Sequence, residues 1–411
     1  MNIEDLFTGV AVIIDDEVKK EEANISNILR QIRSKNIPYI AYDTIPDKNI
    51  VSHFAGVSFV LLDWKLDNEE IIDEGLGGLK IPSTLKEYNI SENIDFLKSL
   101  KEKTFTPVFI FTNEEKDTVI SELQEHKLYQ EDKPNFIFIK NKDELAKELF
   151  SEVEKWIISN PPVYVLLQWN KGYQLAKNRL FWDFYERSPL WPKILWDCYK
   201  ADGANMSREL GEIITRNLYT RIPPISFEES FLEACASVEP DSGEVRNVLE
   251  GERFIKGQYL NSKDIYTGDV YKQEIEEENT KKIVYWLNIR AQCDLVRNRN
   301  PDLYCLKGRQ ISDDEIKNIP FENGEFIEKK NHVIVTCIDD GKIIEFLFRE
   351  LKIHKWNSIK NNRIGRLLPP YITRIQQLYS VYFQRQGLPR NPDEAFPSVT
   401  KSLGNIERLA E

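Results

Sequence analysis

Short runs of apolar residues dominate the first 160 residues, and they alternate with stretches whose apolar residues recur at helical spacing. Each run is almost wholly apolar, so both of its faces are expected to be buried. Strands of this kind belong to parallel sheets that carry helices on both faces. The pattern therefore predicts an α/β doubly wound domain with five strands, at residues 10–14, 37–42, 57–62, 108–111 and 136–139.

Polar residues follow four of these runs directly: Asp15 with Asp16, Asp63, Thr112 and Lys140. Ligands of open parallel sheets bind beyond the carboxyl ends of the strands, so these side chains are expected to converge at one edge. Three carboxylates suit a hard cation such as Mg²⁺. The cation and Lys140 would neutralise charge on a phosphoryl group in transfer to Asp63, and Thr112 would offer its hydroxyl to a phosphoryl oxygen.

The order of these residues resembles the receiver domain of two-component response regulators over roughly residues 8–157. The resemblance implies a flavodoxin-like fold, Asp63 as the phosphoryl acceptor, and a histidine kinase or another phosphodonor as partner. It assigns the Mg²⁺ ligands to Asp15, Asp16, Asp63 and the backbone carbonyl of Lys65. It also assigns the switch hydroxyl, the aromatic switch position and the phosphate-contacting lysine to Thr112, Phe138 and Lys140.

Three features depart from the receiver pattern. Asn113 stands where a small residue usually follows the threonine, which narrows access for a phosphodonor, and Asn141 replaces the usual proline. Residues 67–90 form a glycine-bearing, acidic insertion where a short loop is usual, and we expect a mobile flap or a partner surface there. Two alternatives to a phosphorylated receiver remain. The domain is a relative that is not phosphorylated, or the acids and the lysine are merely strand-end residues.

Length and charge divide the chain into unlike parts. A chain of 411 residues is expected to form two or three domains. Residues 1–160 contain 19 Lys and Arg against 31 Asp and Glu, whereas the remainder contains 36 of each, so the whole acidic excess lies in the first part. We expect a receiver domain at 1–158, a helical connector at 159–250, a β-rich output module at 251–350 and a basic helical tail at 351–411.

The location is expected to be cytoplasmic. No apolar stretch is long enough for a membrane span, the first residues do not resemble a secretory signal, and the five cysteines are scattered without CxxC spacing. A disulfide framework or a cysteine zinc site is therefore not expected.

Residues 163–220 are rich in aromatic residues at helical spacing. Such residues can stack nucleobases, but a helical core is the favoured interpretation, because Leu, Ile and Val fill the intervening apolar positions. Residues 250–350 instead contain short β-rich runs separated by Gly, Asn and Asp, which predicts a small antiparallel barrel or a curled sheet.

Within the β-rich region, residues 288–299 weakly resemble a module of uncharacterised bacterial proteins that contains a Cys-Asp-Leu turn. Cys293 and Asp294 are the candidate output site there. A nucleophilic Cys293 would need a nearby base, and a small buried side chain is the simpler interpretation. Asp294 either caps a turn or binds a metal with Asp269, and turn capping is favoured. Residues 337–346 invite a nuclease interpretation, although 339–342 fit a hairpin turn better.

Residues 351–391 contain eight Lys and Arg and no acid, with aromatic residues interleaved. Such a segment suits a nucleic-acid surface, with candidate phosphate contacts at Lys355, Lys360, Arg363 and Arg366. Docking onto an acidic protein surface, the receiver included, suits it equally.

These features favour an atypical response regulator whose receiver controls a non-standard output region. The alternatives are a receiver-like scaffold that does not switch, and a receiver-controlled effector such as a nuclease or a stress-response or phage-defence toxin. The sequence indicates no enzyme activity beyond phosphorylation and dephosphorylation of the receiver itself, and it leaves an oligomer open.

Overall fold

The computed structural model describes residues 6–20, 23–66, 83–131, 133–201, 205–227, 239–277, 280–296, 300–317, 327–329 and 331–385, with the single residues 233 and 392. The chain divides into two compact units. The first unit contains Met1–Cys198 and Ser207–Glu239, and the second contains Tyr199–Met206 and Pro240–Glu411. Among the described residues, no helix combines the length and apolar character that crossing a membrane requires.

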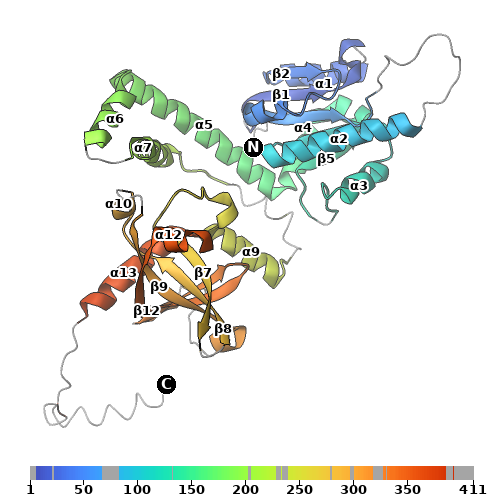
Figure 1. Cartoon of the computed structure of the whole chain (residues 1–411). Coiled ribbons are helices and arrows are strands. Elements are labelled where there is room, and N and C mark those ends of the chain that lie inside the picture. The colour runs from blue at the N-terminus through green and yellow to red at the C-terminus, as the bar shows by residue number, and fades with distance from the viewer. Residues whose placement is uncertain are drawn as a thin grey trace, which may run out of the picture. The chain divides into compact units, whose positions relative to one another are not determined.

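The first unit is built on a five-stranded parallel sheet with the strand order β2-β1-β3-β4-β5 (Figure 1). The strands are β1 (Val10–Ile14), β2 (Tyr39–Tyr42), β3 (Val57–Asp63), β4 (Val108–Thr112) and β5 (Ile137–Asn141). The helices between and after them are α1 (Ala23–Ser34), α2 (Ser83–Lys103), α3 (Lys116–Glu125) and α4 (Lys142–Ile158), with the 3₁₀ turns η2 (Asp16–Lys20) and η3 (Ile50–Gly56). This parallel sheet flanked by helices is compatible with the flavodoxin-like fold expected from the sequence.

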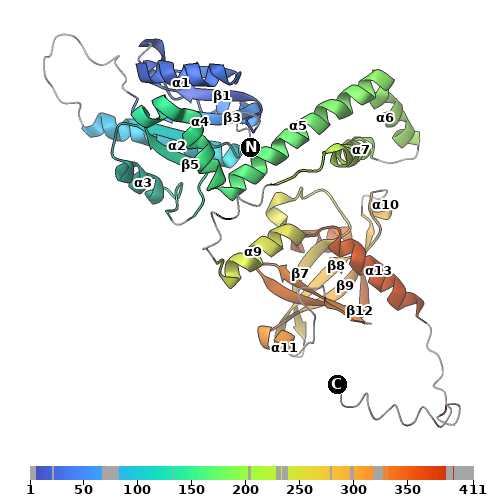
Figure 2. The same ribbon diagram turned by 180° about the vertical axis from the view of Figure 1, so that it is seen from behind.

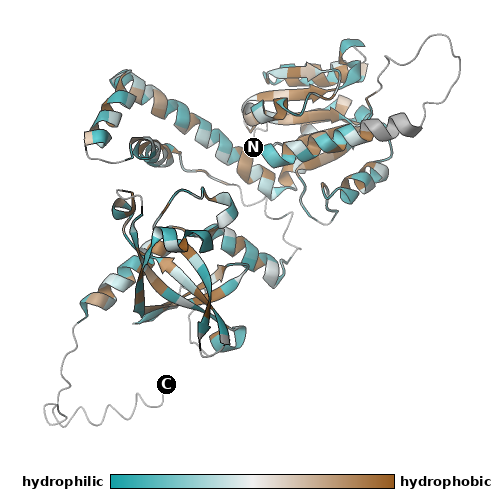
Figure 3. Cartoon of the chain, in the orientation of Figure 1, coloured by the Kyte–Doolittle hydropathy of each residue, from teal (hydrophilic) through white to brown (hydrophobic). Residues whose placement is uncertain are grey.

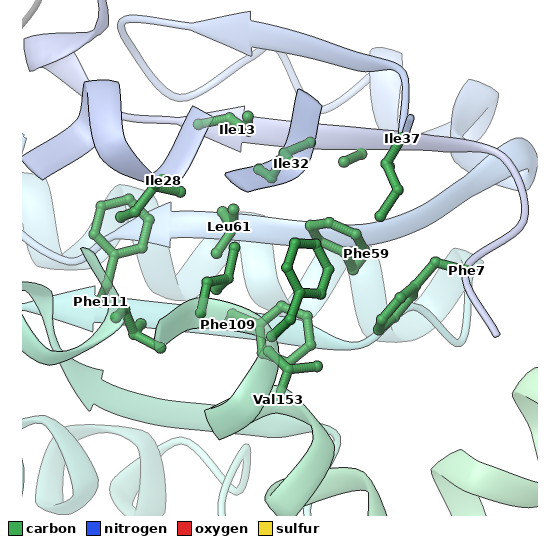
Figure 4. Packing of buried hydrophobic residues seen from close by; sticks show 14 of the residues in the cluster. Phe7, Ile13, Ile28, Ile32, Ile37, Phe59, Leu61, Phe109, Phe111 and Val153 are labelled. Carbon is green, nitrogen blue, oxygen red and sulfur yellow. The ribbon is translucent and has the colours of Figure 1, made fainter. Parts of the chain in front are cut away.

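Successive residues of the strands enter two different cores, because side chains alternate between the faces of a sheet. On one face, Phe59, Leu61, Phe109 and Phe111 pack against α1 and α4 (Figure 4). On the other face, Val60, Leu62 and Ile110 of the strands pack against α2 and α3. The central strands of the first unit are accordingly mostly brown in Figure 3, whereas the helices carry both colours.

Helix α5 (Pro161–Arg187) begins directly after α4, as the proline pair predicts, and is followed by α6 (Trp191–Ala201) and α7 (Met206–Arg221). Its first turns join the core of the first unit through Val163, Tyr164 and Leu167. The expectation of an aromatic helical core is wrong for much of this region, since Trp182 is 63% exposed and Tyr185 55% exposed. Helical spacing identifies a helix, but it does not say what covers the face.

The second unit is built on an eight-stranded antiparallel curled sheet with the order β10-β11-β12-β9-β8-β7-β13-β6 (Figure 2). Its strands are β6 (Phe254–Lys256), β7 (Asp269–Glu277), β8 (Thr280–Asn288), β9 (Asp302–Ile311), β10 (Ile327–Glu328), β11 (His332–Ile338), β12 (Lys342–Lys355) and β13 (Arg363–Leu367). Its helical segments are α9 (Ser242–Arg253), η5 (Gly257–Tyr259), α10 (Gln292–Leu295), α11 (Asp313–Lys317), α12 (Trp356–Ile359), η6 (Lys360–Asn362) and α13 (Tyr371–Gln384).

Helix α13 covers one face of this sheet and buries Ile372 and Ile375 in a core cluster with residues of seven strands. The opposite face packs on Trp356 and Ile359 of α12. The sheet therefore continues through β12 and β13, past residue 350, where the sequence placed the end of the output module. The expected helix after Pro369-Pro370 is present as α13, and residues 386–391 and 393–411 of the expected tail lie outside the described residues.

Candidate functional site: an acidic edge of the parallel sheet

The carboxyl ends of β1, β3 and β4 lie side by side, because these strands are neighbours in the sheet. Asp15 follows the last residue of β1, Asp63 ends β3 and Thr112 ends β4. All three are buried, although each is polar. A buried polar side chain at a strand end is costly unless it is paired or bound, so this edge is where chemistry is expected.

Asp15, Asp16 and Asp63 form the acidic cluster of this edge. One carboxylate oxygen from each lies within 4.8 Å of the other two. The backbone N–H of Glu17 donates to Oδ1 of Asp15 at 2.7 Å, and the N–H of Lys65 donates to Oδ1 of Asp63 at 3.1 Å. These bonds leave further carboxylate lone pairs for a ligand. Oxygen donors at this spacing fit a hard divalent cation.

Burial also sets the protonation of this cluster. Removal from water, with a smaller contribution from the neighbouring Asp15, raises the pKa of Asp63 to about 7 against the opposing effect of Lys142. Burial likewise raises the pKa of Asp15 against the effect of Lys142. A bound cation would stabilise the ionised forms of these two neighbouring carboxylates.

The lysine of this site differs from the expected one. Lys140 pairs with Glu144 at 2.9 Å and Glu152 at 3.0 Å, both on α4. Instead, the amino group of Lys142 lies 3.0 Å from Oδ2 of Asp15 and 3.0 Å from Oδ2 of Asp63.

The physical reason for this difference is the start of α4. The side chain of Asn141 accepts a hydrogen bond from the backbone N–H of Asp143 at 2.9 Å and so caps the helix, which makes Lys142 its first residue. The side chain of Lys142 is only 3% exposed and also pairs with Glu17. Burial alone would lower the pKa of Lys142, but Asp63, Glu17 and Asp15 outweigh burial and raise it. Lys142 and Glu17 were not identified as site residues from the sequence. The available signal for Lys142 was Asn141, a residue type that often caps a helix, directly before Lys142 and Asp143.

The remaining expected residues are placed as follows. The hydroxyl of Thr112 is buried and accepts the N–H of Glu114 at 3.0 Å. Phe138 packs against Phe109 and Trp156, with ring centroids 6.0 and 5.7 Å away. Lys65 follows Asp63 by two positions, and its N–H bonds that carboxylate. Residues 67–82 of the expected insertion lie outside the described residues, and α2 begins at Ser83.

The end of β3 is fixed to its surroundings by polar contacts that the sequence did not indicate. The side-chain amide of Asn93, on α2, donates to the backbone carbonyl of Trp64 at 2.7 Å. The indole N–H of Trp64 donates to Glu122 of α3 at 3.2 Å. Trp64 is 1% exposed and stands next to Asp63, so its fluorescence can report on the site.

In the second unit, Asp269 belongs to a buried ionic cluster and not to a metal site with Asp294. Its Oδ1 lies 2.7 Å from Nε of Arg366, and its Oδ2 lies 3.3 Å from Nη1 of Arg363. The N–H of Tyr266 also donates to Oδ2, which closes the turn before β7. Burial raises the pKa of Asp269, and the two guanidinium groups oppose that rise.

The candidate output site offers little catalytic geometry. The expectation of a buried Cys293 is wrong: this side chain is exposed on α10, and its Sγ lies 3.8 Å from Oδ1 of Asp294. Asp294 itself pairs with Arg290 at 3.5 Å.

The hairpin expected at 339–342 is confirmed between β11 and β12. Oδ2 of Asp339 accepts hydrogen bonds from Lys272, Lys342 and the hydroxyl of Tyr285, at 2.7 to 2.8 Å. These three hydrogen bonds give the Asp339 carboxylate a structural role in the turn, which does not favour a nuclease centre there.

Of the four basic residues proposed to contact nucleic acid, two are largely buried. The side chains of Arg363 and Arg366 are 5% and 14% exposed and pair with Asp269. Lys355 pairs with Asp302 at 2.7 Å. Lys360 is exposed.

No model of a known protein family matches this chain, and no curated protein matches it either.

Proposed function

We propose that the first unit is a receiver domain that takes a phosphoryl group on Asp63 in the presence of Mg²⁺, and that this event controls the second unit. One observation carries the proposal. Asp63 is buried at the end of a central strand, between the carboxylates of Asp15 and Asp16 and the amino group of Lys142. This arrangement supports phosphoryl transfer, because a nucleophile, a cation and a fixed positive charge would then act at one point.

Each residue has a distinct part in the transfer. A carboxylate oxygen of Asp63 forms the new bond to phosphorus, while the bond from phosphorus to the donor breaks and its electron pair leaves with the donor. Lys142 lies close enough to Asp63 to pair with the oxygens of the transferred group. Thr112 carries a buried hydroxyl at the adjacent strand end. Mg²⁺ held by Asp15, Asp16 and Asp63 would neutralise phosphoryl charge.

The second unit is proposed to act as an output region that phosphorylation of the first unit controls, and not as an enzyme. The first unit contains all of the acidic excess of the chain, and the second contains a curled sheet with a cationic segment. The phosphodonor is proposed to be a histidine kinase or a small acyl phosphate.

A second candidate function rests on Lys142. Its amino group contacts Asp15, Asp63 and Glu17 together, and so supplies a positive charge to the same carboxylates that a metal would use. A site satisfied in this way fits a receiver-like scaffold that does not switch. Metal binding and phosphorylation distinguish the two.

The test is to incubate the full chain with Mg²⁺ and acetyl phosphate and to measure its intact mass. We expect one added phosphoryl group on the wild type and none on Asp63→Asn. Mg²⁺ with beryllofluoride should change tryptophan fluorescence, because Trp64 adjoins Asp63, and Asp16→Ala should weaken that response. Equal behaviour of the wild type and Asp63→Asn in both measurements would favour the scaffold.

Two lysine variants test the assignment of the cationic residue. Lys142→Gln should weaken the beryllofluoride response roughly tenfold or more, the size expected when a charge-assisted hydrogen bond is lost. It should at the same time strengthen binding of Mg²⁺ alone, because a competing positive charge has been removed. Lys140→Gln is the matched control, and should alter neither affinity by more than about twofold. The reverse pattern would return the role to Lys140.

A further inference from the structure

The surface of the second unit contains a hollow of about 520 Å³ beside β13. It lies between the segment that follows η5 and the segment formed by α12 and η6, which is labelled at α12 in Figure 1. The polar and charged side chains that line it come from both segments: Ser262, Lys263, Lys360, Asn361 and Arg363. Trp356 supplies an apolar wall, and is anchored in the core below with Tyr271 and Ile359.

Arg363 holds the first of these segments in place. Its Nη1 donates to the backbone carbonyl of Asp264, and its Nη2 donates to that of Asn261 at 2.6 Å. The backbone N–H of Lys263 donates to the side-chain oxygen of Asn261 at 2.9 Å, and the backbone N–H of Asp264 donates to the carbonyl of Asn261 at 3.2 Å. Lys263 is thus carried by a turn with internal hydrogen bonds and a fixed attachment to β13, so the hollow is preformed.

The close approach of the chain at Gly257 also shapes the hollow. A Cβ at this position would lie 3.0 Å from the carbonyl oxygen of Ile364 and 3.2 Å from that of Arg363. Glycine lets η5 lie this close to β13 without a tight Cβ contact. The wall formed by η5 is therefore fixed by backbone contact rather than by mobile side chains.

The hollow has an excess of positive charge. Asp269 is one carboxylate shared by two guanidinium groups, those of Arg363 and Arg366. The ammonium groups of Lys263 and Lys360 have no ion pair or hydrogen bond with any residue that the structure describes. Asp264 is the acid nearest along the chain, and it is not among the residues that line the hollow. In a chain of net charge −12, two unpaired lysines at one concave site, above a buried guanidinium, give this hollow a locally positive character.

We propose that this hollow binds a small molecule that bears a phosphate or diphosphate group. Its volume falls in the range of about 300–1,000 Å³ that is typical of small-molecule sites. Two ammonium groups, a hydroxyl and an amide line the hollow, and such donors recognise phosphate oxygens. An extended nucleic acid would instead need a row of exposed cations, and Arg363 and Arg366 are largely buried. The proposal is independent of phosphorylation in the first unit.

The experiment is isothermal titration of the full chain in Mg²⁺-free buffer with inorganic pyrophosphate, AMP, adenosine and a short DNA duplex. We expect binding of pyrophosphate and AMP and no binding of adenosine. Lys263→Gln and Lys360→Gln should each weaken binding roughly tenfold, as for the loss of one charge-assisted hydrogen bond. Both lysines are exposed, so these variants should fold normally. Lys317→Gln, at a 72% exposed side chain of α11, is the control and should bind as the wild type does.

Absence of binding by pyrophosphate and AMP at millimolar concentration would overturn the proposal. So would binding that neither lysine substitution weakens, because the anion would then lie elsewhere. Binding of the duplex through Lys263 and Lys360 without binding of pyrophosphate would replace the small ligand by nucleic acid.

Discussion

At the scale of single residues, the acidic edge has more negative than positive charge. Asp15, Asp63 and Glu17 share the one amino group of Lys142, and Asp16 pairs with Lys20 at 3.5 Å. Burial makes this imbalance costly, which is why the pKa values of Asp15 and Asp63 are raised. A divalent cation would relieve the imbalance without any change in the fold.

Mg²⁺ binding should therefore depend on pH near neutrality. A bound cation needs the ionised form of Asp63, whose pKa is raised to about 7 by burial, so binding must release a proton below that pH. The affinity should rise about tenfold per pH unit below pH ~7 and level off above pH ~8. Titration calorimetry in buffers of different ionisation enthalpy measures both the affinity and the released proton. An affinity that is constant from pH ~6 to pH ~8 would contradict the placement of Asp63 among the ligands.

The residues of this edge differ in how far the sequence could identify them. Asp15, Asp63 and Thr112 follow apolar runs, and the rule that parallel strands end at one edge brings them together without knowledge of side-chain contacts. The same rule could not decide which lysine contacts the acidic cluster. Lys140 and Lys142 flank Asn141, and the choice between them depends on the cap that Asn141 provides, which is a property of local backbone geometry.

At the scale of elements, the periodicity of apolar residues predicted whether a segment is a helix or a strand better than it predicted which of its residues are buried. The five strands of the parallel sheet follow from apolar runs, although the edge strand β2 is not buried as expected, and α7 and α13 follow from helical spacing. The exposed aromatic residues of α5, such as Trp182, did not follow, because the same spacing describes a core helix and a surface helix. Pairing across distant strands, such as β13 with both β6 and β7, also has no local signal.

That pairing makes Gly365 a critical position. It lies opposite Lys256 of β6 and Val270 of β7, and a Cβ there would lie 2.2 Å from Cζ of Phe254 and 2.4 Å from the carbonyl oxygen of Ile255. Gly365→Ala should lower the free energy of unfolding of the second unit by about 3 kcal/mol, the upper end of the range for overpacking.

The control for this prediction is Gly251→Ala on α9. A Cβ at Gly251 meets nothing within 4 Å, and alanine favours a helix over glycine by up to about 1 kcal/mol. Urea unfolding of the full chain measures both variants. Equal stability of the two would mean that β6 and β13 are not held as closely as the structure shows.

At the scale of the whole molecule, the two units have separate hydrophobic cores. The first is packed on the two faces of the parallel sheet, and the second on the two faces of the curled sheet. Units with their own cores are expected to unfold as separate cooperative transitions. The proposed ligands also divide between them, with Mg²⁺ at Asp63 in the first and a phosphate-bearing molecule at Lys263 and Lys360 in the second.

Scanning calorimetry of the full chain should therefore show two transitions that respond to different ligands. A ligand that binds only the native form raises the stability of its own unit by about 2.7 kcal/mol at one hundred times its dissociation constant. Mg²⁺ with beryllofluoride should raise the midpoint of one transition, and this shift should be absent in Asp63→Asn. Pyrophosphate, added separately without Mg²⁺, should raise the midpoint of the other, and Lys360→Gln should diminish that shift. Control of the second unit by the first requires energetic coupling, so Mg²⁺ with beryllofluoride should also move the second midpoint by a smaller amount, and the size of that second shift measures how strongly phosphorylation of the first unit acts on the second.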